Sequence, residues 1–209
     1  MYTLGADEAG KGPVLGSMFA AAVAADPADL PAVADSKRLS PERREALAGE
    51  VRAVADVGVA EIPVERIDDP GTDMNTLTVE AHAEALAGVA AGGRAVLDAG
   101  DVDADRFARR VADRLDADAD IDAEHRADEQ YAVVAAASIV AKVKRDAHVA
   151  ALAEEYGDVG SGYPGDERTR RFLREYVADH GRLPDCARES WQTSRDALAA
   201  AEQSDIESF

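Results

Sequence analysis

The 209-residue chain has little cysteine, little lysine and no long apolar run. Its single cysteine, Cys186, excludes an internal disulfide, and no Cys/His spacing typical of a zinc site occurs. The longest apolar stretch, near residues 18–25, is too short to span a bilayer. No basic segment with a cleavage site precedes the first fold-like residues. We therefore expect a soluble, cytoplasmic protein without a membrane partner.

Acidic side chains dominate the composition. Asp and Glu number 42 against 23 Lys and Arg, which gives a formal net charge of −19, and only four of the basic residues are lysines. Such a charge does not favour non-specific attraction to nucleic acid. Abundant Asp, Glu and Ala with few Lys resemble proteins of salt-loving cells, where salt screens the repulsion between carboxylates. Most acids should therefore be surface residues, and a functional acid must be argued from its position.

The N-terminal segment YTLGADEAGKGPVLG, residues 2–16, organises the chain. Tyr2 to Ala6 is a short apolar run that suits a buried strand, and Gly10 to Pro13 forms a glycine-rich loop. Asp7 and Glu8 stand between them. Adjacent residues of a regular strand point to opposite faces. The two acids would serve one site only if the strand bends or stops there, and an ordinary acidic turn is the alternative.

The rest of the chain alternates between strand and helix patterns. Strands are expected at 14–25, 57–64 and 95–97, with a short edge strand after the acidic run 116–124, and helices at 41–53, 76–90, 103–115, 132–156, 167–179 and 194–202. This order predicts an α/β fold, a mixed sheet flanked by helices with a small helical C-terminal region. We expect a catalytic domain over residues 1–185, and a C-terminal helix and tail over residues 186–209.

Three carboxylate-bearing stretches stand at element ends. They are the pair Asp7 and Glu8, Asp98 after an apolar strand, and Asp128 ahead of the longest helix. Side chains at strand ends and helix starts of an open α/β sheet can converge on one cleft. Carboxylates without His or Cys suit Mg²⁺ or Mn²⁺ rather than zinc. Two such ions can activate water for phosphodiester hydrolysis.

Six segments, in this order, resemble the motifs of type 2 ribonucleases H (ribonuclease HII) of the archaeal kind. They are GADEAGKGPVLG at 5–16, DSKRL at 35–39, LDAGD at 97–101, EHRADEQYAVVAAASIVAKVKRD at 124–146, GSGYPGD at 160–166 and ESWQT at 189–193. The resemblance implies an RNase H-like fold and an endoribonuclease that hydrolyses the RNA strand of RNA/DNA hybrids. It also implies incision 5′ of ribonucleotides embedded in duplex DNA, which leaves 3′-hydroxyl and 5′-phosphate ends.

The same resemblance assigns the metal ligands and the substrate contacts. The catalytic, metal-binding residues it implies are Asp7, Glu8, Asp98 and Asp128, with two Mg²⁺ or Mn²⁺ ions; Asp101 is the alternative to Asp98. Main-chain groups of Gly10, Lys11 and Gly12 would read the ribose 2′-hydroxyl, which both donates and accepts hydrogen bonds. Tyr163 would stack on the neighbouring sugar, or else simply pack a turn.

A basic helix face completes the substrate-binding set. Ser138, Lys142 and Arg145 share one face of the longest predicted helix, and Lys37 lies in the DSKRL loop. Phosphate binding is the functional interpretation, and a solvated basic patch paired with local acids is the alternative. Positive charge gathered locally on a negative protein suits a site that must admit a polyanion.

The C-terminal tail carries a possible binding motif, and two alternative functions can be compared with the nuclease. Gln203, Ile206 and Phe209 resemble the clamp-binding peptide of replication proteins, and a frayed acidic end is the alternative. A non-catalytic nucleic-acid or clamp-binding module would have lost a site acid, whereas all four are present. A related nuclease for DNA or structured RNA would not need the GKG loop or Tyr163. We expect a monomer.

Overall fold

The structure is a computed structural model that describes residues 2–32, 39–89, 93–115 and 120–207. It comprises two compact units. The first contains Met1–Lys11, Met18–Ile62 and Asp73–Asp146, and the second contains Gly12–Ser17, Pro63–Thr72 and Ala147–Phe209. The sequence predicted a different division, into a catalytic domain over residues 1–185 and a tail over residues 186–209. That division is based on function, and it stays a prediction.

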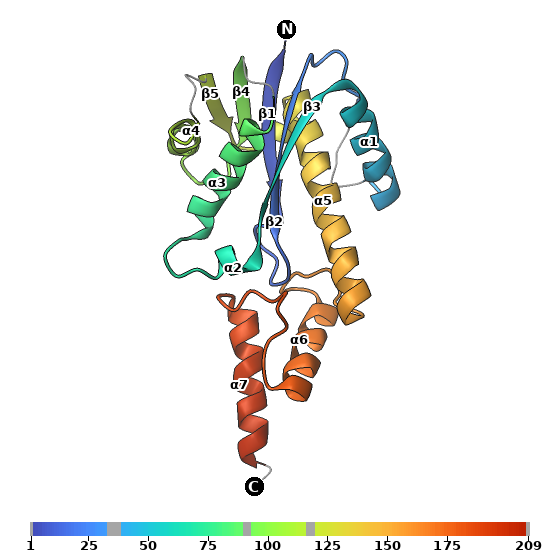
Figure 1. The fold of residues 1–209 in the computed structure, drawn as a ribbon, viewed down its shortest axis with the longest axis vertical. Coiled ribbons are helices and arrows are strands. Elements are labelled where there is room, and N and C mark those ends of the chain that lie inside the picture. The colour runs from blue at the N-terminus through green and yellow to red at the C-terminus, as the bar shows by residue number, and fades with distance from the viewer. Residues whose placement is uncertain (1, 33–38, 90–92, 116–119, 208–209) are drawn as a thin grey trace. The chain divides into compact units, whose positions relative to one another are not determined.

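A five-stranded mixed sheet forms the centre of the first unit (Figure 1). Its strands are β1 (Thr3–Ala9), β2 (Met18–Ala25), β3 (Asp56–Ile62), β4 (Arg94–Asp98) and β5 (Asp120–Glu124), in the order β3-β2-β1-β4-β5. β2 pairs antiparallel with β1 and β3, whereas β4 pairs parallel with β1 and β5. The mixed sheet expected from the sequence is confirmed.

Helices cover both faces of this sheet (Figure 1). They are α1 (Pro41–Val54) and α5 (Ala132–Tyr156) on one face, with α3 (Met74–Ala87) and α4 (Ala104–Ala112) on the other. Ser40 caps α1, since its Oγ accepts a hydrogen bond from Arg43 N. Asp73 and Asp103 cap α3 and α4 in the same way. α5 contributes residues to both units.

Small residues let the helices pack closely on the central strands. Every residue of β2, MFAAAVAA, is buried. Ala21, Val23 and Ala25 share a cluster with buried side chains of α1 and α5. A Cβ on Gly5 of β1 would stand 2.5 Å from the main-chain carbon of Val133. Gly5 therefore allows the start of α5 to lie directly against β1.

The first strand does not stop at the two acids, so a strand end at that point is wrong. β1 continues to Ala9, with Asp7 paired to Ala21 and Glu8 paired to Ala20. Regular pairing with β2 supplies the hydrogen bonds that extend the strand. Other boundaries also differ. β2 begins at Met18 rather than residue 14, and a short helix, α2 (Val64–Ile67), starts where the third strand was expected to end. The edge strand β5 lies within the acidic run 116–124 and not after it.

The second unit is helical. It contains α2, the end of α5, α6 (Glu167–His180) and α7 (Gln192–Glu207). Its apolar cluster includes Leu15, Leu152, Phe172 and Leu173. The helical C-terminal region expected from the sequence is confirmed. Among the described helices, none combines the length and the apolar character needed to cross a bilayer.

Candidate active site

Asp7 faces α5 from the middle strand of the sheet. Its residue is 6% exposed, and its carboxylate is hydrogen-bonded to the hydroxyl of the buried Ser138. Burial, followed by the charge of Glu8, raises the pKa of Asp7 to about 7, and the charge of Asp98 acts in the same direction. Lys142 donates a hydrogen bond to Ser138 and partly offsets this rise. Asp7 is thus a buried carboxylate with other acids close to it.

Glu8 points to the opposite face, toward α3. His82 Nε2 lies 2.9 Å from Glu8 Oε2, and His82 is fully buried. Burial by itself would raise the pKa of Glu8, but the hydrogen bond with His82 and the charge of Lys11 lower it overall. Glu8 is therefore held as a carboxylate by a defined partner.

Asp98 brings the third and fourth acids together. It ends β4, and its Oδ1 accepts a hydrogen bond of 2.7 Å from Ala127 N, the first residue of the 3₁₀ turn η2 (Ala127–Glu129). Asp128 is the next residue of that turn. Burial raises the pKa of Asp98, and the charges of Asp128 and Glu8 add to the rise.

Asp101, the alternative third ligand, has a partner of its own. Arg106 Nη2 lies 2.6 Å from Asp101 Oδ2, and the hydrogen bond from this guanidinium lowers the pKa of Asp101. The Asp101 side chain is only 2% exposed. An acid satisfied in this way is a weaker candidate for a metal ligand than Asp98, so we keep Asp98.

The four carboxylates suit hard divalent cations, although their side chains are not arranged as a complete metal-binding site. The charges of Glu8 and Asp98 act on Asp7, and those of Asp128 and Glu8 act on Asp98. Within residues 2–32, 39–89, 93–115 and 120–207, however, no three His, Cys, Asp or Glu side chains stand close enough to hold one ion. Asp7, Glu8 and Asp98 are instead each hydrogen-bonded to a different protein group. Carboxylate oxygens with uncompensated charge fit Mg²⁺ or Mn²⁺.

A pocket of about 510 Å³ opens beside Glu8. Its other polar lining residues include Lys11, Asn75, Arg106 and His125. Lys11 Nζ donates to Asn75 Oδ1 at 3.1 Å and also to the carbonyl of Gly100. The side chain of Lys11 is thereby fixed to the pocket wall. Gly10, just before it, has a φ of 93° at the end of β1.

In the second unit, the structure brings Gly12 and Tyr163 together. A Cβ on Gly12 would stand 3.8 Å from Tyr163 Cε1, and Tyr163 is 43% exposed. Trp191 Nε1 donates a hydrogen bond of 3.3 Å to Gly12 O. The exposed ring therefore lies against main chain that Trp191 holds in place.

The basic helix face is only partly free for phosphate. Lys142 is bonded to Ser138 close to Asp7, and Arg145 Nη1 lies 3.6 Å from Asp146 Oδ1. Lys37 lies outside the described residues. On this helix face, Lys142 is thus the residue whose charge acts on Asp7.

The predicted tail residues lie at the end of α7. Gln203 is an exposed residue of this helix. Ile206 also belongs to α7, but its side chain is outside what the structure describes, as is Phe209.

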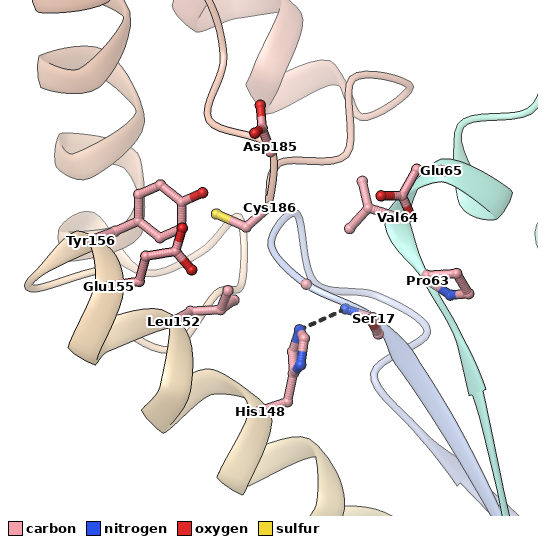
Figure 2. Close-up of a pocket in the computed structure, with 11 residues that line it drawn as sticks. Ser17, Pro63, Val64, Glu65, His148, Leu152, Glu155, Tyr156, Asp185 and Cys186 are labelled. Atoms are coloured by element: carbon pink, nitrogen blue, oxygen red, sulfur yellow. Dashed lines mark hydrogen bonds between the residues drawn. The ribbon is translucent and has the colours of Figure 1, made fainter.

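A second pocket, of about 290 Å³, contains none of the predicted site residues (Figure 2). His148 Nε2 accepts a hydrogen bond of 3.2 Å from Ser17 N there. Cys186 lines the same pocket, and burial raises the pKa of its thiol to about 12. His148 therefore fixes a turn, and Cys186 is a poor nucleophile.

Sequence reasoning missed His82. Its only signal was a lone histidine among the mostly apolar buried residues of a helix, such as Leu77, Ala81 and Ala85. Such a pattern also fits a histidine that merely fills a core. Only the fold reveals that the ring meets Glu8, 74 residues away in the sequence.

Comparisons with known proteins agree with these features. The family model described as Ribonuclease HII matches residues 4–194. A Ribonuclease HII of Halobacterium salinarum is 66% identical over 212 residues, covering 100% of both chains. The crystal structure of the ribonuclease H2 from Pyrococcus horikoshii OT3 has a TM-score of 0.90 at 36% identity, covering 97% of this chain and 100% of that one. The structure of the PCNA:RNase HII complex from Archaeoglobus fulgidus has a TM-score of 0.85 at 40% identity, covering 93% and 96%.

These likenesses confirm the resemblance indicated by the sequence motifs and the RNase H-like fold. They also confirm that the chain is an endoribonuclease, a hydrolase of the ribonuclease H type that acts on RNA/DNA hybrids. The chain belongs to the ribonuclease HII family.

Proposed function

We propose that this endoribonuclease incises duplex DNA on the 5′ side of embedded ribonucleotides, leaving 3′-hydroxyl and 5′-phosphate ends. In this proposal Asp7, Glu8, Asp98 and Asp128 hold two Mg²⁺ or Mn²⁺ ions. The observation that carries it is that the acids act on one another: the charges of Glu8 and Asp98 reach Asp7, and those of Asp128 and Glu8 reach Asp98. Divalent cations would relieve this charge. We expect the enzyme to act as a monomer in the cytoplasm.

The chain's own residues prepare this site. When bound, two such ions supply an activated water and stabilise the leaving oxygen. Ser138 holds Asp7, His82 holds Glu8, and the amide of Ala127 holds Asp98, so three acids are oriented before any ion enters. Lys142 adds positive charge beside Asp7, which suits contact with a substrate phosphate.

Ribose recognition is assigned to the glycine loop and to Tyr163. Gly10, Lys11 and Gly12 offer main-chain groups that can approach a 2′-hydroxyl closely, because glycine has no side chain. The exposed ring of Tyr163 beside Gly12 offers a stacking surface for the neighbouring sugar. Both features support discrimination of ribose from deoxyribose.

The test uses duplex DNA with one embedded ribonucleotide, with Mg²⁺ or Mn²⁺, at low and at molar salt. We expect incision 5′ of the ribonucleotide, with end groups identified by ligation and by phosphatase sensitivity. We expect activity at molar salt because metal–phosphate bonds are short-ranged and weakly screened. No incision under any of these conditions would refute the proposal, even if long hybrids were cleaved.

The role of the acids is tested by Asp7→Asn. This change removes a charged ligand but no phosphate contact, so turnover should be lost while duplex binding is largely retained. Asp26→Asn, at an exposed turn after β2, is the matched control and should cut normally. Equal activity of the Asp7 variant and the wild type would show that the site is misplaced.

We also propose that residues 203–209 bind a sliding clamp. Two observations support it: Gln203 is exposed on α7, and the related Archaeoglobus fulgidus protein is described in a complex with PCNA. Deleting residues 203–209 should abolish binding to the clamp in a pull-down and leave incision of a short duplex unchanged. Undiminished clamp binding would remove the proposal.

A further inference from the structure

Among the residues that the structure describes, His82 has one hydrogen-bond partner, the proposed metal ligand Glu8. The residue is fully buried in α3, and its Nε2 lies 2.9 Å from Glu8 Oε2. Its other ring nitrogen, Nδ1, is buried and has no hydrogen-bond partner among the described residues. The imidazole is thus directed at Glu8 alone.

The contact between His82 and Glu8 shows which group donates the hydrogen bond. An ionised carboxylate only accepts hydrogen bonds, so the proton lies on Nε2 of His82 and is donated to Glu8 Oε2. A proton on Nδ1 would bury an N–H without an acceptor, which is costly. His82 therefore acts on Glu8 through one directed hydrogen bond.

The ring is also fixed in orientation. Phe107 of α4 meets it edge-on, with ring centroids 5.0 Å apart and planes at 84°. Phe107 is itself fully buried. A ring held between α3 and α4 cannot turn without disrupting this packing, so it fixes Glu8 Oε2 in turn.

We propose that His82 is a positioning residue of the metal site, one that sets how Glu8 binds a cation. By engaging Oε2, it favours ligation of a cation through the other oxygen, Oε1, alone. Single-oxygen ligation suits the strict octahedral geometry of Mg²⁺, whereas Ca²⁺ readily accepts both oxygens of a carboxylate. The inference rests on the proposed function, because it needs Glu8 to be a ligand.

The test compares His82→Leu, which removes the donor, with His82→Gln, which keeps an N–H donor. Mn²⁺ and Ca²⁺ affinities are measured by calorimetry without substrate. We expect His82→Leu to weaken Mn²⁺ binding roughly 10- to 100-fold, the usual effect of losing a group that orients a ligand. Ca²⁺ binding should weaken less, so the ratio of the Mn²⁺ affinity to the Ca²⁺ affinity should fall. His82→Gln should restore most of the lost Mn²⁺ affinity.

A control and a kinetic measurement separate positioning from folding. His180→Gln changes an exposed histidine of α6 in the second unit and should leave both affinities unchanged. At saturating Mn²⁺, His82→Leu should lower kcat and leave KM for the nucleic acid unchanged, because a fully buried side chain offers no surface to the substrate. A general loss of structure would instead affect KM as well.

The outcomes are distinct. Wild-type affinities for both ions in His82→Leu would overturn the role of His82 while leaving the proposed function intact. A wild-type protein that binds no Mn²⁺ would overturn the metal mechanism itself. If His82→Leu does not fold, nitrogen-15 spectra of the wild-type protein decide: the Nε2 resonance of His82 should shift when Mg²⁺ is added, and an unmoved resonance refutes the proposal.

Discussion

The amide of Val14 donates a hydrogen bond of 2.8 Å to the carbonyl of Gly162. The next amide, that of Leu15, donates to the same carbonyl at 3.2 Å. The residue after the acceptor is Tyr163, whose ring lies against Gly12. Main-chain hydrogen bonds, which few side-chain changes can remove, therefore set the position of this exposed ring beside Gly12.

Tyr163→Ala should impair incision at single embedded ribonucleotides. Loss of a stacking surface should lower kcat/KM by roughly 10- to 100-fold, as for other aromatic stacking contacts with nucleic acid. Tyr163→Phe keeps the ring and should retain most of the activity. Tyr2→Ala, which removes another exposed tyrosine, is the control. A Tyr163→Ala enzyme with unchanged kcat/KM would support the alternative that the ring only packs a turn.

Asp98→Asn and Asp101→Asn should have very different effects. Asp98 shares its electrostatic environment with Asp128 and Glu8, so its neutralisation should lower kcat by at least about 1000-fold. Asp101 is paired with Arg106, so its change should cost less than about tenfold in kcat and should act mainly on stability. Single-turnover cleavage at saturating Mn²⁺ measures both. The reverse order would make Asp101 the third ligand.

Local features of the fold could be predicted from the sequence, but pairings between distant residues could not. The cap at Ser40 and the ending of β4 at Asp98 depend on neighbouring residues, and both were predictable. The continuation of β1 through Asp7 and Glu8 depends on pairing with β2, and no local pattern reveals it. The same holds for His82 and Glu8, and for Trp191 and Gly12, which only the tertiary fold brings together.

Gly16→Ala should destabilise the second unit. Gly16 has a φ of 77°, which strains an alanine, and a Cβ there would stand 2.7 Å from His148 Cδ2. The imidazole would have to move and would lose its hydrogen bond with Ser17 N (Figure 2). Together the two effects should lower the free energy of unfolding by about 2–4 kcal/mol, measured by urea denaturation at fixed salt.

Substitutions at two other glycines separate the backbone strain of a positive φ from the steric contact with His148. Gly157 has a φ of 85° with open space around its Cβ position, so Gly157→Ala should show the conformational cost alone, about 1–2 kcal/mol. Gly49 lies inside α1 with open space and without a positive φ, so Gly49→Ala should stabilise by about 0.5–1 kcal/mol. If Gly16→Ala cost no more than Gly157→Ala, the contact with His148 would be unimportant.

Asp166 should make stability depend on pH in the acid range. It caps α6, with Oδ1 accepting from Arg168 N at 3.0 Å and Oδ2 accepting from Ser161 N at 2.7 Å. The hydrogen bond from Ser161 N is the main reason why the pKa of Asp166 falls from 3.8 to about 2. Because the folded pKa is the lower one, the ionised carboxylate favours the folded state.

This stabilisation is complete above the unfolded pKa and is lost as the pH falls toward about 2, where the folded protein also takes up the proton. The asparagine of Asp166→Asn cannot ionise. Its side-chain NH₂ group cannot accept a hydrogen bond, so it cannot replace the carboxylate oxygen that accepts from a main-chain N–H. The wild type should therefore be more stable than the variant by a constant amount above about pH 5, and the difference should shrink below about pH 4. Urea denaturation of both proteins across this range, at fixed salt, measures the difference. If the difference in the free energy of unfolding persisted unchanged to pH 2, it would arise from side-chain packing and not from the charge of Asp166.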